Sequence, residues 1–411
     1  MRILIVSQYF WPEGFRINDL VKSLVERGIE VDVLTGKPNY PDGKIFSGYQ
    51  ALGCMQEVWS GANIFRVPLL PRGEDGVFRL AINYLSFIFF GLIFGPYLLR
   101  GRKFDVVFVY GLSPILLAIP GIFISWIKKV KLVIWVQDLW PESLTATGFM
   151  KDGFIVRAVR SLVKWIYWRA DLILVQSRAF ESSIVSMAPG KQVIYLPNSV
   201  DPSFSTWVPG KFLQKRVEPL EHGFSVVFAG NIGVAQGVEC LLDAATLLRD
   251  HTEIRFVIFG SGRKWQWMSD QISQRGLVNI HLVGRFPIEE MPGYLQKADV
   301  LLVSLKDQPI FSLTVPSKIQ AYMASGKPIV ASLNGEGARL ISESGAGIAV
   351  PAEDPRALVD AIFTLYEMPN GDRKKIGEKG RLYYQKHFDH DVLVTCLIDH
   401  FKMLESNKEI F

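Results

Sequence analysis

The sequence predicts an α/β protein built from two doubly wound parallel sheets. Short apolar runs of strand length alternate with segments of helical length and period, and this alternation starts again near residue 223. The chain has 411 residues, which is enough for two or three domains with large apolar cores. We therefore expect two α/β domains joined by a linker.

The expected strands are the short apolar runs. In the first domain they are Arg2–Ser7, Glu30–Thr35, Asn63–Pro68, Asp105–Tyr110, Lys131–Val136, Asp171–Gln176 and Gln192–Leu196. In the second they are Ser225–Ala229, Ile254–Phe259, Asn279–Val283, Val300–Ser304, Pro328–Ala331 and Gly347–Val350. Residues 203–222 are loosely patterned, so we place the linker there and the two domains at 1–202 and from 223 onward.

Composition and charge exclude several classes of protein. The net charge of +5 is too small for a protein that binds nucleic acid through bulk charge. The chain opens with a short buried strand, Met1–Ser7, and not with a secretory signal. Cys54, Cys240 and Cys396 are isolated, which indicates a reducing compartment and no metal-binding spacing. We expect a cytoplasmic protein without a metal site.

The stretch 304–332 has the pattern of a phosphate site. A buried strand ends there, a polar turn follows, and Pro316, Ser317 and Lys318 begin a helix. A helix start directs free N–H groups and a positive dipole end toward the preceding turn, and Lys318 adds a full charge. Proline near a helix start is also ordinary capping chemistry. Ser317 and Lys318 are therefore candidates for binding phosphate.

The segment 322–330, Tyr-Met-Ala-Ser-Gly-Lys-Pro-Ile-Val, resembles the donor-site segment of family-4 retaining glycosyltransferases. That segment usually carries two glutamates, which here are replaced by Leu313 and Ala321. The resemblance covers essentially the whole chain and implies the GT-B fold, two Rossmann-like domains that face each other across a cleft. It implies an acceptor-side domain at 1–202, a nucleotide-sugar-binding domain at 223–384, and a helix at 385–411 that crosses back to the first domain.

The loop after the first strand is a second candidate region. Pro12 and Gly14 predict a turn, and a helix follows. The acidic residues near this helix start need only complement its dipole. The resemblance implies more, because this loop contacts the donor phosphates and the acceptor in such enzymes. Glu13 is then a catalytic candidate, Gly14 a donor contact, and Arg16 and Asn18 acceptor contacts.

Asp138 directly follows the buried strand 131–136, so its carboxylate should emerge at the carboxyl edge of the sheet. Family-4 relatives commonly place a histidine or aspartate at this point, and the resemblance therefore implies a catalytic role for Asp138. The alternative is that Asp138 caps a helix beginning near Pro141.

Residues 228–239 have the pattern of a strand, a glycine turn and a helix, which suits a phosphate-cradling turn or a merely tight one. The family usually carries a basic residue and a Lys-Gly pair here. Asn231 and Gln236 stand in their place, so positive charge must come from elsewhere. The donor-binding candidates in this domain are Gly230, Asn231, Gln236, Arg263, Arg285, Ser317 and Lys318.

Three segments suggest contact with a membrane. Residues 80–99 and 106–127 carry no charge and each is long enough to span a bilayer. Glycines and prolines break the second run, and the neighbouring strands must share one sheet, so a buried or interfacial helix is expected, with a pair of spans as the alternative. Residues 151–169 form a basic aromatic helix with Arg157, Arg160 and Lys164, which suits an anionic surface or a solvated edge.

The resemblance implies a retaining glycosyltransferase of the O-antigen or capsule type, on the inner face of the plasma membrane. Its donor would be a UDP-sugar, its acceptor a lipid-linked saccharide, and the sugar N-acetyl-L-fucosamine or another N-acetylated hexose. No metal or other cofactor is expected, and Asp389-His390-Asp391 is interpreted as a coincidence. Two alternatives are a sugar-nucleotide 2-epimerase and a non-catalytic partner subunit that binds sugar nucleotides.

Overall fold

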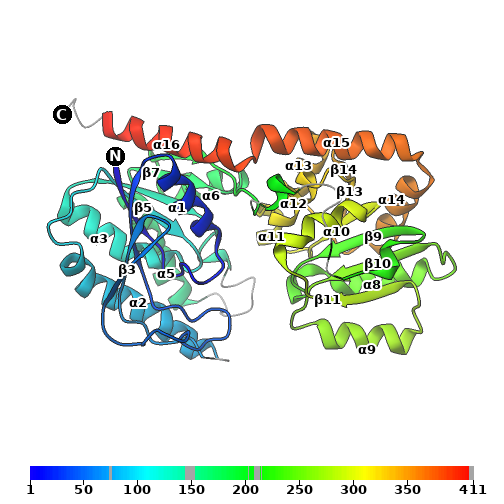
Figure 1. Cartoon of the computed structure of the whole chain (residues 1–411), viewed down its shortest axis with the longest axis horizontal. Helices are drawn as coiled ribbons and strands as arrows, with labels where there is room; N and C mark the ends of the chain where they lie inside the picture. The colour runs from blue at the N-terminus through cyan, green and yellow to red at the C-terminus, as the bar shows by residue number, and fades with distance from the viewer. Residues whose placement is uncertain (74–75, 144–152, 202, 208–212, 214, 407–411) are drawn as a thin grey trace. The chain divides into compact units, whose positions relative to one another are not determined.

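The computed structural model of the chain contains two compact α/β units (Figure 1). It describes residues 1–73, 76–143, 153–201, 203–207, 213 and 215–406. The first unit consists of Met1–Pro197 and the chain from Leu393, and the second of Asn198–Val392. The prediction of two doubly wound α/β domains is confirmed.

The first unit is built on a sheet of eight strands in the order β3-β4-β2-β1-β5-β6-β7-β8. All neighbours are parallel except β3 and β4. Each predicted strand is present to within about two residues at either end, because buried parallel strands are nearly continuous apolar runs. Their bounds are β1 Arg2–Val6, β2 Glu30–Thr35, β3 Met55–Trp59, β4 Ala62–Arg66, β5 Val106–Gly111, β6 Lys131–Val136, β7 Leu172–Val175 and β8 Gln192–Tyr195.

Sequence reasoning missed strand β3, which forms an antiparallel hairpin with β4. The two-residue turn consists of Ser60 and Gly61, both with positive φ, which is the turn that suits the twist of a hairpin. Alternate residues of β3 are exposed, so the strand lacks the apolar run that identified the others. The Ser-Gly pair was the available signal.

Helices cover both faces of the first sheet. α1 and α16 pack on one face, where they bury the side chains of alternate strand residues such as Ile5 and Phe108. α3 packs on the other face, where Gly121 lies against Val109 and Val6. α2 and α5 lie beside α3 in the same layer. The helices of this unit are α1 Arg16–Glu26, α2 Val77–Leu98, α3 Ile119–Lys128, α5 Phe154–Arg169, α6 Ala179–Met187 and α16 His390–Ser406, with the short turn η1 Ile115–Ala118.

The second unit has a six-stranded parallel sheet in the order β11-β10-β9-β12-β13-β14. Its strands are β9 Phe224–Ala229, β10 Ile254–Phe259, β11 Ile280–Gly284, β12 Val300–Ser304, β13 Ile329–Ser332 and β14 Gly347–Val350. Its helices are α7 Ser203–Thr206, α8 Val238–Leu247, α9 Trp265–Arg275, α10 Met291–Lys297, α11 Pro309–Leu313, α12 Ser317–Ala324, α13 Glu336–Ser344, α14 Pro355–Glu367 and α15 Asn370–His387, with the short turns η2 Glu218–Leu220, η3 Val234–Gln236 and η4 Ile288–Glu290. α8 and α14 pack on one face, and α10 and α12 on the other.

The two uncharged runs have different structures. Residues 106–127 form β5, η1 and most of α3, as the glycines and prolines predicted. Residues 80–99 lie in α2, and within the described part of the chain Phe78–Leu98 is the one helix long and apolar enough to cross a membrane. β4 precedes α2, and β5 follows it in the same sheet, so α2 does not carry the chain across a bilayer. Residues 151–152 of the predicted basic helix and 208–212 and 214 of the predicted linker lie outside the described residues.

Candidate active site

The turns that follow β9 and β10 pack against each other at the carboxyl edge of the second sheet. The Gly230 N–H donates to the carbonyl of Phe259 and the Ile232 N–H to that of Ser261, each at 2.9 Å. Gly260 has a φ of 124°, and a Cβ atom there would lie 1.8 Å from the Gly230 carbonyl oxygen. Only glycine allows two backbones to approach so closely. The glycines thus have a packing role in addition to any contact with phosphate.

α12 brings Lys318 to the turn after β9. The Lys318 Nζ donates to Oε1 of Gln236 at 2.7 Å and lies 3.6 Å from the centre of the Phe228 ring. A Cβ atom on Gly230 would lie 2.6 Å from Cε of Lys318, so the lysine side chain lies directly over this glycine. Three of the predicted donor-binding residues, Gly230, Gln236 and Lys318, therefore form one cluster.

The ammonium group of Lys318 has lost much of its hydration. Part of the side chain remains accessible, but protein atoms surround it, and this burial lowers the pKa of Lys318 to about 7. An anion bound beside it would restore the favourable charge. The cluster therefore has the electrostatics of a phosphate site in which Lys318 is most fully protonated when an anion is bound.

Tyr322, one helical turn after Lys318, fixes the end of β9. Its hydroxyl accepts from the Ala229 N–H at 2.8 Å and donates to the Ala229 carbonyl at 3.3 Å. Burial raises the pKa of this phenol well above its usual range, so it stays neutral and can make both bonds. Sequence reasoning did not single out Tyr322. Its spacing of four residues from Lys318, on the same side of a helix, was the available signal.

The remaining predicted donor residues lie at the surface of the second unit. Asn231, Arg263, Arg285 and Ser317 are all exposed. The Arg285 Nε donates to the hydroxyl of Ser261, which brings this guanidinium to the turn after β10. Their exposure leaves Arg263 and Arg285 accessible to a ligand.

Two further lysines near the glycine turn are paired with a carboxylate. Glu239, in the first turn of α8, accepts from Lys264 at 2.9 Å and lies 3.7 Å from Lys306. These pairs reduce the free positive charge near the turn. At the two positions where glutamates were expected, Leu313 ends α11 and Ala321 lies within α12.

In the first unit, Glu13 is buried and holds two loops together. One carboxylate oxygen accepts the N–H groups of Asn39 and Tyr40, each at 2.7 Å, and the other accepts the Phe10 N–H at 3.2 Å. Burial raises the pKa of Glu13 to about 7, and these three N–H groups oppose that rise. Because backbone donors bind both oxygens, Glu13 holds the two loops in position. The catalytic role that the resemblance implies for Glu13 stays a prediction.

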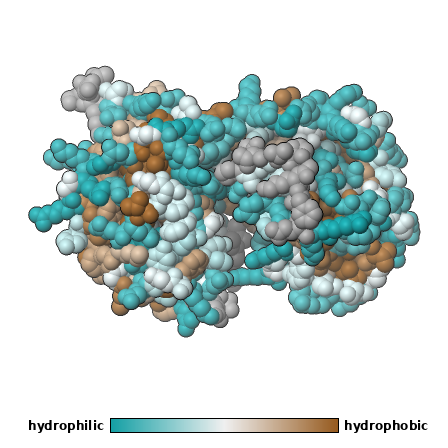
Figure 2. All heavy atoms as spheres, in the orientation of Figure 1, coloured by the Kyte–Doolittle hydropathy of each residue, from teal (hydrophilic) through white to brown (hydrophobic). Residues whose placement is uncertain are grey.

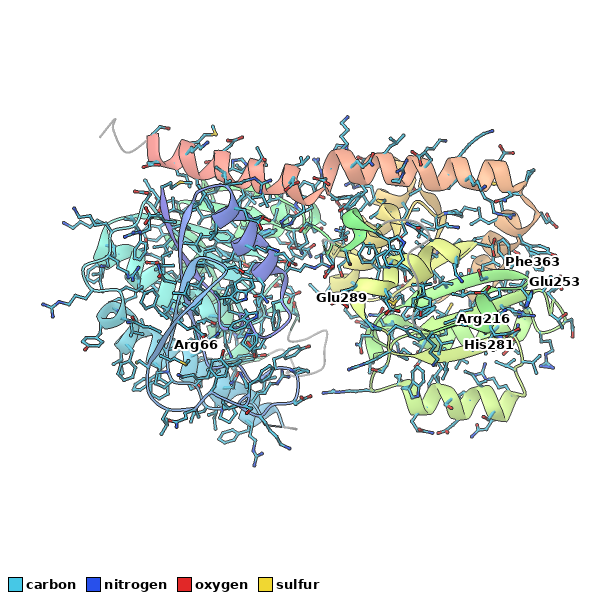
Figure 3. All side chains as sticks on the ribbon, viewed as in Figure 1. Arg66, Arg216, Glu253, His281, Glu289 and Phe363 are labelled. Carbon is cyan, nitrogen blue, oxygen red and sulfur yellow. The ribbon has the colours of Figure 1, made fainter. Side chains whose placement is uncertain are left out.

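Arg66, at the end of β4, supports the same loops and was missed by sequence reasoning. Its guanidinium is fully buried, pairs with Glu57 at 2.5 Å, and donates to the carbonyls of Gly36, at 3.0 Å, and Trp11. Figure 3 labels Arg66 within the first unit. It thereby ties the end of β4 to the loops after β1 and β2. No local pattern marks this role, because the two carbonyls that Arg66 binds lie 30 and 55 residues away in the chain.

Asn18 belongs to this framework as well. Its Nδ2 donates to the Glu13 carbonyl at 2.7 Å, and its Oδ1 accepts the Trp11 N–H at 3.0 Å. Gly14, in contrast, is exposed, and a Cβ atom there would meet nothing within 4 Å. The fold thus imposes no steric requirement for glycine at position 14.

Asp138 lies just beyond β6, and burial raises the pKa of its carboxyl. Burial also raises the pKa of Tyr110 to about 12, with Arg16 opposing the rise and Asp138 adding to it. Arg16, Tyr110 and Asp138 are therefore close enough to interact at the carboxyl edge of the first sheet. Of the helix predicted to begin near Pro141, the residues from 144 to 152 lie outside the described part of the chain.

Aromatic rings line the neighbouring loops. Tyr9 and Phe15 stack with ring centres 5.0 Å apart, Tyr40 packs 5.1 Å from Phe15, and Arg72 lies 5.2 Å over the Tyr40 ring. The charge of Arg72 opposes, and that of Asp138 adds to, the rise that burial causes in the pKa of Tyr84. Stacked rings beside a cation offer a surface of the kind that binds sugars and anions.

The described residues contain no group of three histidine, cysteine or acidic side chains placed to hold a metal ion. In the Asp389-His390-Asp391 segment, the Asp389 carboxylate accepts the N–H groups of Asp391, at 3.0 Å, and Val392, at 3.3 Å. These are the bonds of a helix cap for α16.

Two family models match the chain: a "Glycosyl transferase 4-like domain" over residues 14–199 and "Glycosyl transferases group 1" over 223–368. The chain is 30% identical to the probable glycosyltransferase WbjE of Pseudomonas aeruginosa over 335 residues, which are 77% of this chain and 79% of that protein. It is 25% identical to the putative colanic acid biosynthesis glycosyl transferase WcaI of Escherichia coli K12, over 97% of this chain and 99% of that one.

Solved structures share the fold over the whole chain. A sucrose-phosphate synthase from Thermosynechococcus elongatus superposes with a TM-score of 0.74 and 17% identity, covering 99% of both chains. Anabaena HepE in complex with UDP superposes with a TM-score of 0.71 and 14% identity, covering 98% of this chain and 100% of that one. The fold is therefore GT-B, and the two family models with the WbjE match show that this chain belongs to the glycosyltransferases.

Proposed function

We propose that the chain is a retaining glycosyltransferase that moves a sugar from a UDP-sugar to a lipid-linked saccharide during synthesis of a cell-surface polysaccharide. The observation that carries the proposal is the Lys318 cluster, where a lysine with a pKa of about 7 lies over Gly230 at the end of β9. A diphosphate is the ligand that this cation, this turn and the first turn of α12 would hold together.

The class of reaction is supported by the relatives. WcaI is named for colanic acid biosynthesis, and a D-rhamnosyltransferase WbpZ of P. aeruginosa is 27% identical over 39% of this chain. HepE was crystallised with UDP, and with UDP-glucose. These names support a UDP-linked donor and an acceptor from polysaccharide assembly. The proposal of an N-acetylated hexose, such as N-acetyl-L-fucosamine, rests on the sequence resemblance alone.

Retention of configuration needs no protein nucleophile in this scheme. The bond between the anomeric carbon and the phosphate oxygen breaks, and its electron pair leaves with UDP. An acceptor hydroxyl attacks from the same side and forms the new bond, while its proton passes to the departing phosphate oxygen. Lys318 stabilises the charge that develops on the diphosphate. Asp138 orients the acceptor hydroxyl, and Glu13 and Arg66 hold the surrounding loops in place.

A panel of nucleotide sugars, each incubated with and without a lipid-linked acceptor, tests this proposal. Transfer of label from a UDP-sugar to the acceptor, with retained configuration, is the expected result. Formation of an epimeric sugar nucleotide without acceptor would indicate a 2-epimerase instead. Binding without turnover of any donor would indicate a non-catalytic subunit, a role that fits the replacement of both family glutamates by Leu313 and Ala321.

A peripheral site on the inner face of the plasma membrane is part of the proposal. On α5, the basic residues Arg157, Arg160 and Lys164 are exposed, while Val156 and Val163 are buried against the unit. Each exposed basic residue near an anionic leaflet contributes about 1 kcal/mol, and salt weakens it. High salt or alkaline carbonate should release the protein from membranes. Retention through both treatments would contradict peripheral attachment.

A further inference from the structure

The helix α2 has its apolar side turned outward. Leu85, Phe89, Ile93 and Tyr97 recur at intervals of four residues, and each is at least 50% exposed. Residues at this spacing lie along one side of a helix, so the four form an outer strip. Figure 2 shows tan and brown atoms along the lower left of the molecule, where Figure 1 draws α2. A surface helix of a globular protein normally exposes its polar side instead.

The inner side of α2 carries polar groups that bond to loops of the candidate active site. Asn83 is fully buried; its Oδ1 accepts from Nε2 of Gln8 at 2.6 Å, and its Nδ2 donates to the Leu70 carbonyl at 2.6 Å. The Ser86 hydroxyl accepts the Leu70 N–H at 3.1 Å. Gln8 precedes Tyr9, and Leu70 lies two residues before Arg72. Polar bonds therefore seat α2 on the unit beside the aromatic loops.

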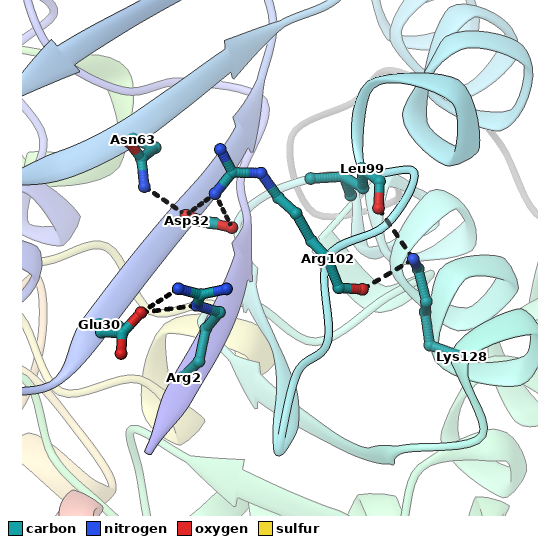
Figure 4. A network of polar contacts seen from close by, with 7 residues as sticks. All are labelled: Arg2, Glu30, Asp32, Asn63, Leu99, Arg102 and Lys128. Carbon is teal, nitrogen blue, oxygen red and sulfur yellow. Dashed lines mark hydrogen bonds and ion pairs between the residues drawn. The ribbon is translucent and has the colours of Figure 1, made fainter.

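The end of α2 is also fixed to the unit. Lys128 of α3 donates to the carbonyls of Leu99, at 2.8 Å, and Arg102, at 2.9 Å, and Arg102 pairs with Asp32 of β2 at 2.8 Å (Figure 4). A helix held at its inner side and its end cannot turn its strip inward. The fold of the first unit therefore keeps the strip on the outside.

The surroundings of the strip are basic. Over residues 76–131 the sequence contains a single acid, Asp105, against seven lysines and arginines. The exposed members of this group are Arg79, Arg100, Lys103 and Lys129. Trp126 and Ile127 of α3, which packs beside α2, are exposed as well. An apolar strip with aromatic residues and flanking cations complements an anionic lipid surface, where rings enter the interface and cations meet headgroups.

We propose that α2 lies in an anionic lipid surface through Leu85, Phe89, Ile93 and Tyr97. The next step rests on the proposed function: with α2 in the lipid surface, the protein would bind its lipid-linked acceptor at that surface. Its lipid stays in the surface that α2 occupies, and its first anionic group meets Arg72, whose guanidinium lies over Tyr40 next to the loops that Asn83 holds.

Sedimentation with vesicles tests the strip without any sugar. Wild-type protein should bind vesicles of phosphatidylcholine mixed with phosphatidylglycerol and bind phosphatidylcholine alone less well. The double variant Leu85→Gln with Phe89→Gln should bind the mixed vesicles about tenfold or more weakly. The wild-type leucine and phenylalanine bury apolar surface in the lipid, and the glutamines do not. Leu382→Gln replaces a leucine of similar exposure in the second unit, 55% against 60% for Leu85, and should bind as wild type does. Circular dichroism and UDP binding confirm that each variant folds.

Vesicle binding that is equal for the double variant and the wild type would overturn the proposal. So would light scattering that shows a dimer for the wild type and a monomer for the double variant, since the strip would then meet a second copy. Failure of the donor panel together with strip-dependent vesicle binding would refute the proposed function and leave the lipid surface established.

The acceptor contact has its own test. Arg72→Gln should raise the KM for a lipid-linked acceptor by about tenfold while vesicle binding stays unchanged, because one charge-assisted contact is lost. An unchanged KM would remove Arg72 from the acceptor site.

Discussion

The ammonium group of Lys318 lies 2.7 Å from Oε1 of Gln236 and 3.6 Å from the centre of the Phe228 ring. A glutamine and a ring face provide weak compensation for the burial of a full positive charge, so the pKa of Lys318 falls to about 7. The site is therefore incomplete electrostatically until an anion binds. This relationship links the fold of α12 to the binding of the proposed donor.

Lys318→Ala should weaken the binding of UDP by about 1–3 kcal/mol, the range for a charge-assisted hydrogen bond. The diphosphate raises the pKa of Lys318 from about 7, so binding takes up a proton above pH 7, and affinity falls as pH rises through the range between the free and bound pKa values. Calorimetry in buffers of different ionisation enthalpy measures this uptake.

Arg263→Ala serves as the comparison, because Arg263 is exposed and should contribute less than Lys318. UDP affinity that is unchanged in both single variants would show that neither side chain holds the diphosphate.

The stability of the protein should depend on pH through Glu13. Its pKa is raised from 4.5 to about 7 in the folded state, so the folded protein binds more protons than the unfolded chain between these values. Glu13 therefore stabilises the folded state below pH 4.5, and this contribution is lost as the pH rises through about 7. The loss is on the order of 3 kcal/mol in the free energy of unfolding.

Urea unfolding of the wild type and of Glu13→Gln, at pH 5 and at pH 8, measures this effect. The glutamine of the variant cannot ionise, whereas Glu13 loses its stabilising contribution as the pH rises. Relative to the wild type, the free energy of unfolding of Glu13→Gln should therefore be higher at pH 8 than at pH 5. A difference that is the same at both pH values would show that the three backbone N–H groups keep the Glu13 pKa near its ordinary value.

Gly14→Ala separates a functional glycine from a structural one. The added Cβ meets nothing within 4 Å, and Gly14 does not have a positive φ, so the variant should be as stable as the wild type or about 0.4–1 kcal/mol more stable. If donor or acceptor approaches the backbone here, kcat/KM for transfer should fall. Equal stability and equal kcat/KM would exclude a substrate contact at position 14.

Asp138→Asn keeps the size of the side chain and removes its charge. If the carboxylate orients the acceptor hydroxyl, turnover should fall by about 10²–10⁴-fold while the affinity for UDP is retained. Steady-state kinetics and calorimetry measure the two quantities. A variant that unfolds would favour the helix-capping role of Asp138, and one that folds and transfers sugar at the wild-type rate would rule out a catalytic role.

The strands, helix starts and glycine turns of both domains could largely be predicted from the sequence. Buried parallel strands are short apolar runs, so thirteen of the fourteen strands in the described residues were predicted. Strand β3 was missed because alternate side chains along it are exposed. The start of α12 at Ser317 was predicted from the preceding proline. Gly230 and Lys318 were identified as phosphate-site candidates because glycine turns and helix starts also have local sequence signatures.

Tertiary structure alone decided which of these residues meet. Lys318 lies over Gly230 because β12, which leads to α12, is the neighbour of β9 in the sheet, and no local pattern specifies that order. Glu13 and Arg66 hold loops together through distant partners: Glu13 binds the Asn39 N–H, 26 residues away, and Arg66 binds the Trp11 carbonyl, 55 residues away. The sequence by itself determined that 80–99 is uncharged and helical, but polar bonds from Asn83 decided which side of α2 faces outward, since an apolar helix has no charged side to orient it.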